Sequence, residues 1–169
     1  MARPHGSRGT LAALALAGAA VLAVSVAGAM QNSPPDRSQD IAWMSQQQAY
    51  IGTLKAEDGW QVMPGGLKWR RVAGAGTGPR PTVDDTVTVH YRGTFLDGTV
   101  FDSSYDRGEP ATFPLSRLVK AWQLAIPQMA VGDTIEIAAP ADLAYGPQGR
   151  GPIPGGATLL FTVELLGIK

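Results

Sequence analysis

The sequence predicts an α+β fold in which an antiparallel sheet wraps around one short helix. From Val83 to the C-terminus, several short runs alternate apolar and polar residues with the period of two that is typical of half-buried strands. The segment from Leu118 to Ile126 instead repeats its apolar residues at helical spacing. The 21 glycines and 13 prolines gather in turns, as expected for short strands joined by tight connections.

The N-terminus is an apolar leader. Leu11 to Met30 contains no charged residue and follows the basic residues Arg3 and Arg8, and Ala27-Gly28-Ala29 fits the small-x-small cleavage pattern of a secretory signal. A stretch of about 20 residues is also long enough to span a bilayer as a helix. We therefore expect residues 1–30 to be a cleaved signal peptide or an N-terminal membrane anchor. Both interpretations place the rest of the protein outside the cytoplasm.

Residues 31–65 read as a linker that contains one short helix. Gln31 to Asp40 is polar and includes a proline pair. Ser38 to Glu57 has a loose helical pattern, in which four apolar residues partly share one face: Ile41, Met44, Tyr50 and Leu54. We expect Gly59 and the Pro64-Gly65-Gly66 run to end this helix.

The sheet is expected to begin with a strand from Leu67 to Val72, followed by the Gly- and Pro-rich loop GAGTGPRP. Val87, Val89 and Tyr91 alternate with polar residues, which predicts a strand with one buried face. Leu96-Asp97-Gly98-Thr99 supplies an Asp-Gly turn between two β-favouring runs. The run from Val87 to Pro110 is therefore predicted to be a strand, a turn and a second strand.

Later elements follow the same logic. Thr112 to Leu115 is a short strand, and the next apolar residues fall on one helical face: Leu118, Trp122, Ala125 and Ile126. Pro127 disfavours helical geometry at Ile126, so this helix should end there. Two final strands are predicted from alternating residues, one at Ile135 and Ile137 and one from Phe161 to Leu165. The faces with Tyr91, Trp122 and Phe161 should point to the same interior.

Charge and composition exclude several classes of function. The formal net charge is zero, which argues against a nucleic-acid partner. The absence of cysteine excludes disulfides, thiolate metal sites and thiol nucleophiles. His5 lies in the leader and His90 on the strand face opposite Tyr91, so neither a Ser-His-Asp hydrolase nor a metal site is expected, and His90 should be structural. The glycine runs lack the Lys-Ser/Thr of a phosphate loop.

Four segments carry a resemblance to a known family, and they occur in the family's order: VTVHYRGTFLDGTVFDSSYDRGEP, AWQLAIPQMAVGD, APADLAYGPQG and IPGGATLLFTVELLGIK. From about Gly66 to Lys169 the sequence resembles the FKBP-type peptidyl-prolyl cis-trans isomerases, of the exported bacterial type with a single FKBP domain. The resemblance implies a five- or six-stranded antiparallel sheet curled around a short helix. It assigns residues 66–169 to the isomerase domain.

Rotation about an X-Pro peptide bond also suits the residues themselves. The rotation barrier of ~20 kcal/mol reflects the partial double-bond character of the amide. Twisting the amide reduces its dipole, so a dry apolar pocket disfavours the planar state more than the twisted one. Such a reaction needs no nucleophile, metal or cofactor, and we expect none. An aromatic pair with one carboxylate and no nucleophile, Tyr91 and Phe101 with Asp102, suggests a chemistry of this kind.

The resemblance also implies roles for individual residues. The catalytic positions are Tyr91, Asp102 and Tyr145, and the substrate-binding positions are Phe101, Leu118, Val119, Trp122, Ile153 and Phe161. Trp122 would form the floor of a proline pocket, the Val119 backbone N–H would bind a substrate carbonyl, and the Tyr145 hydroxyl would donate to the ligand. Asp102 has alternative interpretations, since it could bond turn backbone groups or pair with Arg107 or Tyr91.

Three positions depart from the family pattern. Ala121 stands where glycine is usual, Ala111 stands where some members have another pocket aromatic, and the loop from Gly149 to Pro154 looks one residue short, with Arg150 where some members have histidine. These departures bear on substrate preference and on macrolide affinity more than on the basic activity.

The leading hypothesis is an exported prolyl isomerase that acts on proline-containing polypeptide clients. Immunosuppressant-type macrolides are further candidate ligands. The alternative is a proline-pocket binding module or holdase chaperone with little turnover. We expect a monomer, because residues 38–57 are too short for a large dimerising N-terminal domain, and we expect membrane contact only through an uncleaved leader.

Overall fold

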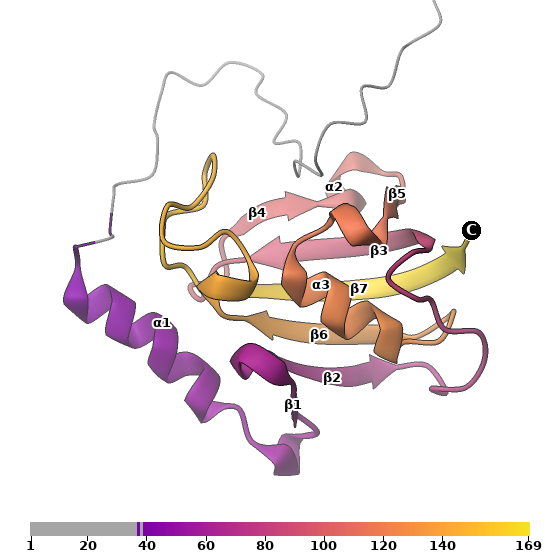
Figure 1. The fold of residues 1–169 in the computed structure, drawn as a ribbon, viewed down its shortest axis with the longest axis horizontal. Coiled ribbons are helices and arrows are strands. Elements are labelled where there is room, and N and C mark those ends of the chain that lie inside the picture. Colours follow the sequence, from indigo (N-terminus) through magenta and orange to yellow (C-terminus); the bar gives the residue numbers. More distant parts are fainter. Residues whose placement is uncertain (1–36, 38) are drawn as a thin grey trace, which may run out of the picture.

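The computed structural model describes Arg37 and residues 39–169 (Figure 1). The predicted leader, residues 1–30, and most of the polar linker segment lie outside the described residues. In the described part of the chain, no helix combines the length and the apolar character needed to cross a membrane.

Short strands and helices make up the described residues. The strands are β1 (Gln61–Val62), β2 (Lys68–Ala73), β3 (Thr86–Thr94), β4 (Val100–Ser103), β5 (Ala111–Pro114), β6 (Thr134–Ala139) and β7 (Leu159–Ile168). The α-helices are α1 (Ile41–Thr53), α2 (Ser104–Arg107) and α3 (Lys120–Ala125). Single turns of 3₁₀ helix cover Ala56–Asp58, Pro64–Gly66, Leu115–Arg117, Ile126–Gln128 and Ala141–Leu143.

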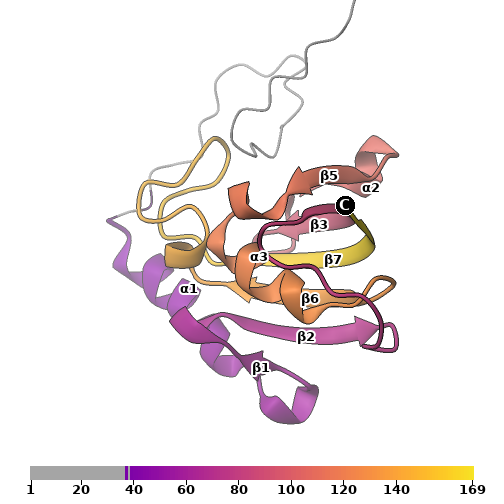
Figure 2. The ribbon, with the colours of Figure 1, turned by 45° about the vertical axis from the view of Figure 1, so that its right-hand side comes forward.

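All of these strands belong to one antiparallel sheet with the order β1-β2-β6-β7-β3-β4. β5 also pairs with β3, at Thr86 to Val89, whereas β4 pairs with β3 further along, at Arg92 to Thr94. Seven strands therefore occupy six positions across the sheet. Helix α3 lies across one face of the sheet (Figures 1 and 2), which confirms the predicted fold class.

The core lies between α3 and the sheet. The alternating residues of the central strands are buried on the face toward α3: Val87, Val89, Tyr91, Ile135, Ile137, Phe161, Val163 and Leu165. Ala121, Trp122 and Ala125 supply the helical side of the same cluster. Each large apolar side chain removed from water stabilises the fold by about 1.5–3 kcal/mol. The strand and helix patterns in the sequence are thus confirmed.

The second strand of the Val87–Pro110 run is shorter than predicted. The Asp-Gly turn is present, with Thr99 N–H donating to Asp97 Oδ1 at 2.8 Å and with Gly98 at φ 85°. Strand β4, however, ends at Ser103, whose hydroxyl accepts from Asp106 N–H at 3.2 Å and caps α2. A serine at this position stabilises a helix start, and this local bond replaces the continuing strand.

Helix α1 falls inside the predicted segment, but its boundaries and buried face differ from the prediction. It ends at Thr53, well before Gly59. Ile41 is 80% exposed, whereas Gln47 is only 6% exposed. Gln47 Oε1 accepts from Thr158 N–H at 3.0 Å, and the Gln47 carbonyl accepts from the Thr158 hydroxyl at 2.9 Å. A polar residue thus anchors α1, so a pattern of apolar residues could not identify this face.

Asp133 connects the loop after β2 to the turn before β6 through hydrogen bonds of its carboxylate. Its carboxylate accepts from the backbone N–H of Gly76 at 2.9 Å and of Ala130 at 2.9 Å, and from Arg71 Nε at 3.0 Å. Burial alone would raise the pKa of Asp133, but the two backbone donors and Arg71 outweigh it and hold the pKa below its usual value. The ionised carboxylate is therefore part of the folded structure.

We expect Asp133→Asn to destabilise the protein by about 2–4 kcal/mol at pH 7, because the amide group cannot accept from all three donors. Since the folded-state pKa is lowered, the wild-type carboxylate stabilises the fold at neutral pH and loses this effect as the pH falls below its usual value of 3.8. The difference between wild type and variant in urea unfolding should therefore shrink toward pH 3. Asp84→Asn, at an exposed position, is the control. A difference that stays constant between pH 7 and pH 3 would contradict the assignment.

Candidate functional site

Four predicted site residues form one aromatic cluster. The rings of Tyr91 and Trp122 meet edge to face, with centroids 5.2 Å apart at 79°. Trp122 and Phe161 meet in the same way at 5.5 Å and 85°. Phe101 then packs on Phe161 at 5.8 Å and 89°. Edge-to-face packing is favourable for aromatic rings. Strands β3, β4 and β7 and helix α3 thus bring these residues together from distant parts of the sequence.

Asp102 joins this cluster through a closed set of hydrogen bonds. The Tyr91 hydroxyl donates to Asp102 Oδ2 at 2.6 Å. Arg107 forms an ion pair with Asp102 Oδ1 and also donates from Nη2 to the Tyr91 hydroxyl at 2.7 Å. Both pairings that the sequence left open for Asp102 are therefore present. Its carboxylate is buried, and each of its oxygens has a partner.

The electrostatics of this set keep the Tyr91 hydroxyl protonated. Burial raises the pKa of Tyr91 above its ordinary value, and the hydrogen bond to Asp102 raises it further, whereas Arg107 acts in the opposite direction. Burial would lower the pKa of Arg107, but its bonds to Tyr91 and Asp102 outweigh this and raise it. At neutral pH Tyr91 is therefore a neutral phenol and Arg107 a charged guanidinium.

Tyr145 and Ile153 lie on the long loop between β6 and β7. Ile153 is 5% exposed and belongs to the buried core, and Tyr145 packs against that core. Arg150 and Ile153 exchange two backbone hydrogen bonds, of 2.8 and 2.9 Å, which close the tip of the loop. Burial raises the pKa of Tyr145, and the Asp102 carboxylate adds to this effect while Arg150 opposes it. The Tyr145 hydroxyl therefore remains a donor at neutral pH and lies within electrostatic reach of Asp102.

Leu118 and Val119 directly precede α3, and both are partly buried against the core. The Val119 carbonyl accepts from the N–H groups of Trp122 and Gln123, at 3.0 and 3.2 Å. Within residues 39–169 the Val119 N–H donates no hydrogen bond. Over the same residues the buried Trp122 indole N–H also has no acceptor. Two donors near the cluster thus have no protein acceptor among the described residues.

Two residues of the cluster were missed by sequence reasoning. A Cβ added to Gly93 would lie 2.5 Å from Phe101 Cζ, so only glycine allows the Phe101 ring to lie against β3. A glycine inside an alternating strand is the signal that could have identified it. Phe95 packs on Phe101 with ring centroids 5.1 Å apart. Its position beside the Asp-Gly turn gave no comparable signal.

His90 lies on the opposite face of β3, as predicted. Its Nδ1 shares a 2.9 Å hydrogen bond with the Ser104 hydroxyl, and its ring stacks on Tyr105 at 4.6 Å. The Ser104 hydroxyl also accepts from Tyr91 N–H at 2.7 Å. His90 therefore helps to fix α2 to β3 and is separated from the aromatic cluster by the sheet.

Comparisons with known proteins agree with this geometry. The family model described as FKBP-type peptidyl-prolyl cis-trans isomerase matches residues 78–166. Over 122 residues the chain is 45% identical to the outer membrane protein MIP of Legionella longbeachae, covering 72% of this chain and 52% of that protein. Over 120 residues it is 45% identical to the FKBP-type peptidyl-prolyl cis-trans isomerase FkpA of Aeromonas hydrophila, covering 71% and 44%. The chain thus spans about half the length of the curated relatives it matches.

Solved structures give the same result. The crystal structure of FkpA from Escherichia coli is similar to this chain with a TM-score of 0.73 and 37% sequence identity, covering 78% of this chain and 62% of that one. The crystal structure of AtFKBP13 is similar with a TM-score of 0.59 and 33% identity, covering 65% and 98%.

We expect Gly93→Ala to displace the Phe101 ring and to destabilise the protein by about 1–3 kcal/mol, because the added methyl group overlaps the ring. Chemical denaturation measures the stability, and near-ultraviolet circular dichroism reports the change in aromatic packing. Gly167→Ala is the matched control, since a Cβ there has nothing within 4 Å. Equal effects of the two substitutions would show that the close approach at Gly93 does not matter.

Proposed function

Because the chain belongs to the family of FKBP-type peptidyl-prolyl cis-trans isomerases, we propose that it catalyses rotation about X-Pro peptide bonds in proline-containing polypeptides. The observation that carries the proposal is the buried edge-to-face packing of Tyr91, Trp122 and Phe161 within the matched region. Such a cluster offers a proline ring an apolar, desolvated environment. It supplies no nucleophile, and the reaction needs none.

The physical basis is the polarity of the amide. The planar X-Pro bond is stabilised by resonance, which sets a rotation barrier of ~18–20 kcal/mol. The twisted amide is less polar than either planar isomer, so transfer from water to apolar surroundings costs the twisted state less. We propose that Trp122 forms the floor under the proline ring. In this proposal Phe101, Leu118, Ile153 and Phe161 line the sides.

Hydrogen bonds would then hold the chain on either side of the twisted bond. The Val119 N–H, which has no acceptor within residues 39–169, is suited to bind a substrate carbonyl. The Tyr145 hydroxyl, kept protonated by its raised pKa, is suited to donate to a second one. Preorganised donors favour the transition state when they match its shape better than that of the planar ground state.

Asp102 is best explained as a positioning residue. Both of its carboxylate oxygens already have partners, Tyr91 on one and Arg107 on the other. These bonds fix the Tyr91 hydroxyl while Trp122 fixes the Tyr91 ring. The proposal therefore assigns Asp102 the orientation of the Tyr91 wall and leaves direct contact with the substrate to the tyrosines.

The proposed setting is outside the cytoplasm. The apolar leader predicted for residues 1–30 supports export, and one relative is named an outer membrane protein. Clients would then be exported polypeptides with slow X-Pro steps, which take tens of seconds without catalysis. N-terminal sequencing of protein recovered from cells distinguishes a cleaved signal peptide from a retained anchor. Macrolide binding and a monomeric state complete the proposal.

The wild-type protein should accelerate a proline-limited refolding reaction. Trp122→Leu should lower kcat/KM about ten-fold or more, because it removes two aromatic contacts. Tyr145→Phe should lower it about five-fold, the value of one hydrogen bond. Tyr105→Phe, on an exposed tyrosine of α2, is the matched control and should leave the rate unchanged. No acceleration by a folded wild-type sample would leave the binding module or holdase as the better hypothesis.

A double-mutant cycle tests the role of Asp102. If Asp102 acts through Arg107 and Tyr91, Asp102→Asn and Arg107→Gln should each lower kcat/KM by about three- to ten-fold, and the double variant should be little worse than either one. Residues that share one set of hydrogen bonds lose that set together, so the effects of their substitutions are not additive. Additive losses would instead assign Asp102 a separate contact with the substrate.

A further inference from the structure

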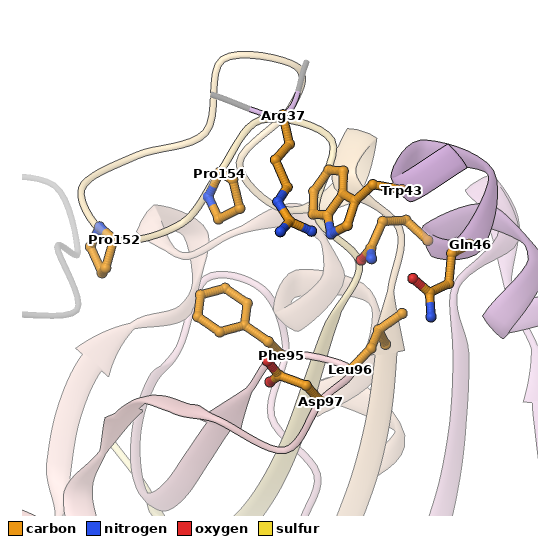
Figure 3. Close-up of a pocket in the computed structure, with 9 residues that line it drawn as sticks. Arg37, Trp43, Gln46, Phe95, Leu96, Asp97, Pro152 and Pro154 are labelled. Atoms are coloured by element: carbon orange, nitrogen blue, oxygen red, sulfur yellow. The ribbon is translucent and has the colours of Figure 1, made fainter. Parts of the chain in front are cut away.

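A groove lies between α1, the turn after β3 and the loop before β7. Its volume is about 360 Å³, and its apolar lining residues are Trp43, Phe95, Leu96, Pro152 and Pro154, with Arg37, Gln46, Gln47 and Asp97 as the polar ones (Figure 3). We call it the α1 groove. A volume of this size falls at the lower end of the roughly 300–1,000 Å³ typical of ligand pockets. It is large enough for one or two side chains of a polypeptide.

Two walls of the groove adjoin residues of the proposed proline site. On one wall, the Phe95 ring packs on Phe101 at 5.1 Å, and Phe101 packs on Phe161. On the other wall, Pro152 and Pro154 flank Ile153, the residue proposed for the rim of the proline site. The α1 groove therefore lies beside the proposed proline site.

The distance suits a polypeptide that continues beyond its proline. Three ring contacts lead from Phe95 through Phe101 and Phe161 to Trp122, each shorter than 6 Å between centroids. An extended chain covers about 3.3 Å per residue, so at most about five residues separate a proline ring on Trp122 from Phe95. A client that has its proline at the cluster would place adjacent residues in the groove.

The outer wall of the groove is fixed to the core. Buried Gln47 holds α1 to Thr158 through two hydrogen bonds, of 3.0 and 2.9 Å. Trp43 packs against the hydrophobic core. A wall held in this way needs no reordering when a ligand binds, which lowers the entropic cost of binding.

The lining predicts the chemistry of the ligand. The Trp43 and Phe95 rings and the two prolines offer apolar surface. The Arg37 guanidinium lies over the Trp43 ring, 5.7 Å from its centroid, and Asp97 lies across the groove with the opposite charge (Figure 3). A ligand of either net charge would gain from one of these charges and lose from the other. An uncharged segment with an apolar or aromatic side chain fits better, since its backbone amides can also use the polar edge.

We propose that the α1 groove binds the segment of the client chain adjacent to the isomerised proline, with an apolar or aromatic side chain against Phe95 and beside the Arg37 guanidinium that lies over Trp43. This inference rests on the proposed function and adds a subsite to it. Because α1 precedes the residues that match the family model, which begin at residue 78, the subsite would select clients through a part of the chain outside that match. The favoured substrates are extended chains with apolar residues near the proline.

Two peptides test the subsite. One is a tetrapeptide that contains the X-Pro bond, and the other is a ten-residue peptide with the same X-Pro bond and phenylalanines two to five residues away on both sides. We expect Leu96→Arg, which fills the groove with a charged side chain, to lower kcat/KM for the long peptide about five- to ten-fold and to leave the tetrapeptide unaffected. Ile41→Ser, at an 80% exposed position of the same helix, is the matched control. Equal losses for both peptides would overturn the subsite.

A binding measurement separates this proposal from the catalytic one. In ¹H–¹⁵N spectra of the full chain, with the Trp43 and Trp122 indole signals assigned by Trp43→Phe and Trp122→Leu, the long peptide should shift both signals, and the tetrapeptide should shift only that of Trp122. If neither peptide is isomerised, the proposed activity fails, and the Trp43 signal alone still decides whether the groove binds the chain. The proposal is wrong if the Trp43 signal does not shift when the long peptide is added. It is also wrong if the Trp43 signal shifts with protein concentration alone, because the groove would then bind a second copy of the chain.

Discussion

The edge-to-face packing of Trp122 on Tyr91 and Phe161 is the contact on which the rest of the structure depends. Helix α3 is only six residues long, and it has no side-chain cap at its N-terminus. A helix this short is not stable by itself and depends on tertiary packing. Trp122 supplies that packing by contacting β3 and β7 at once. The residue that attaches the helix to the sheet is therefore the same residue that is proposed to receive the substrate.

Buried charge also reinforces the cluster. Tyr91 is fully buried, and polar contacts fix its orientation in addition to the ring packing. The Tyr91 hydroxyl makes these contacts with Asp102 and Arg107. A buried ion pair adds little net stability compared with apolar packing, but the loss of one partner is costly because the other charge stays buried. The arrangement favours one orientation of Tyr91 more than it favours overall stability.

The sequence was sufficient for the features that depend on periodicity. Val87, Val89 and Tyr91 alternate on β3 as predicted, and Trp122 and Ala125 face the sheet because helical spacing places them there. It was insufficient where a single hydrogen bond decides the local structure. The Ser103 cap ends β4 early, and buried Gln47 selects the inner face of α1. Both are polar contacts that no apolar pattern encodes.

The candidate site shows the same division. The family motifs identified the aromatic residues of the cluster and Asp102. They did not decide whether Asp102 pairs with Tyr91 or with Arg107, because a strand, a turn and a second strand separate these two residues in the sequence. Gly93 and Phe95 were missed since their importance arises from contact with one ring, that of Phe101. A residue that affects a site only through a neighbouring side chain can be identified only when the position of that side chain is known.

Helix α1 extends this argument from the site to the domain boundary. A division of the chain by sequence pattern assigns residues 31–65 to a linker, and the family model begins at residue 78. The hydrogen bonds between Gln47 and Thr158 nevertheless attach α1 to the start of β7, next to the loop that contains Ile153. Because this attachment is polar and specific, it fixes one orientation of the helix, whereas an apolar face alone would tolerate sliding. A segment that reads as a linker therefore acts as part of the wall beside the proposed site.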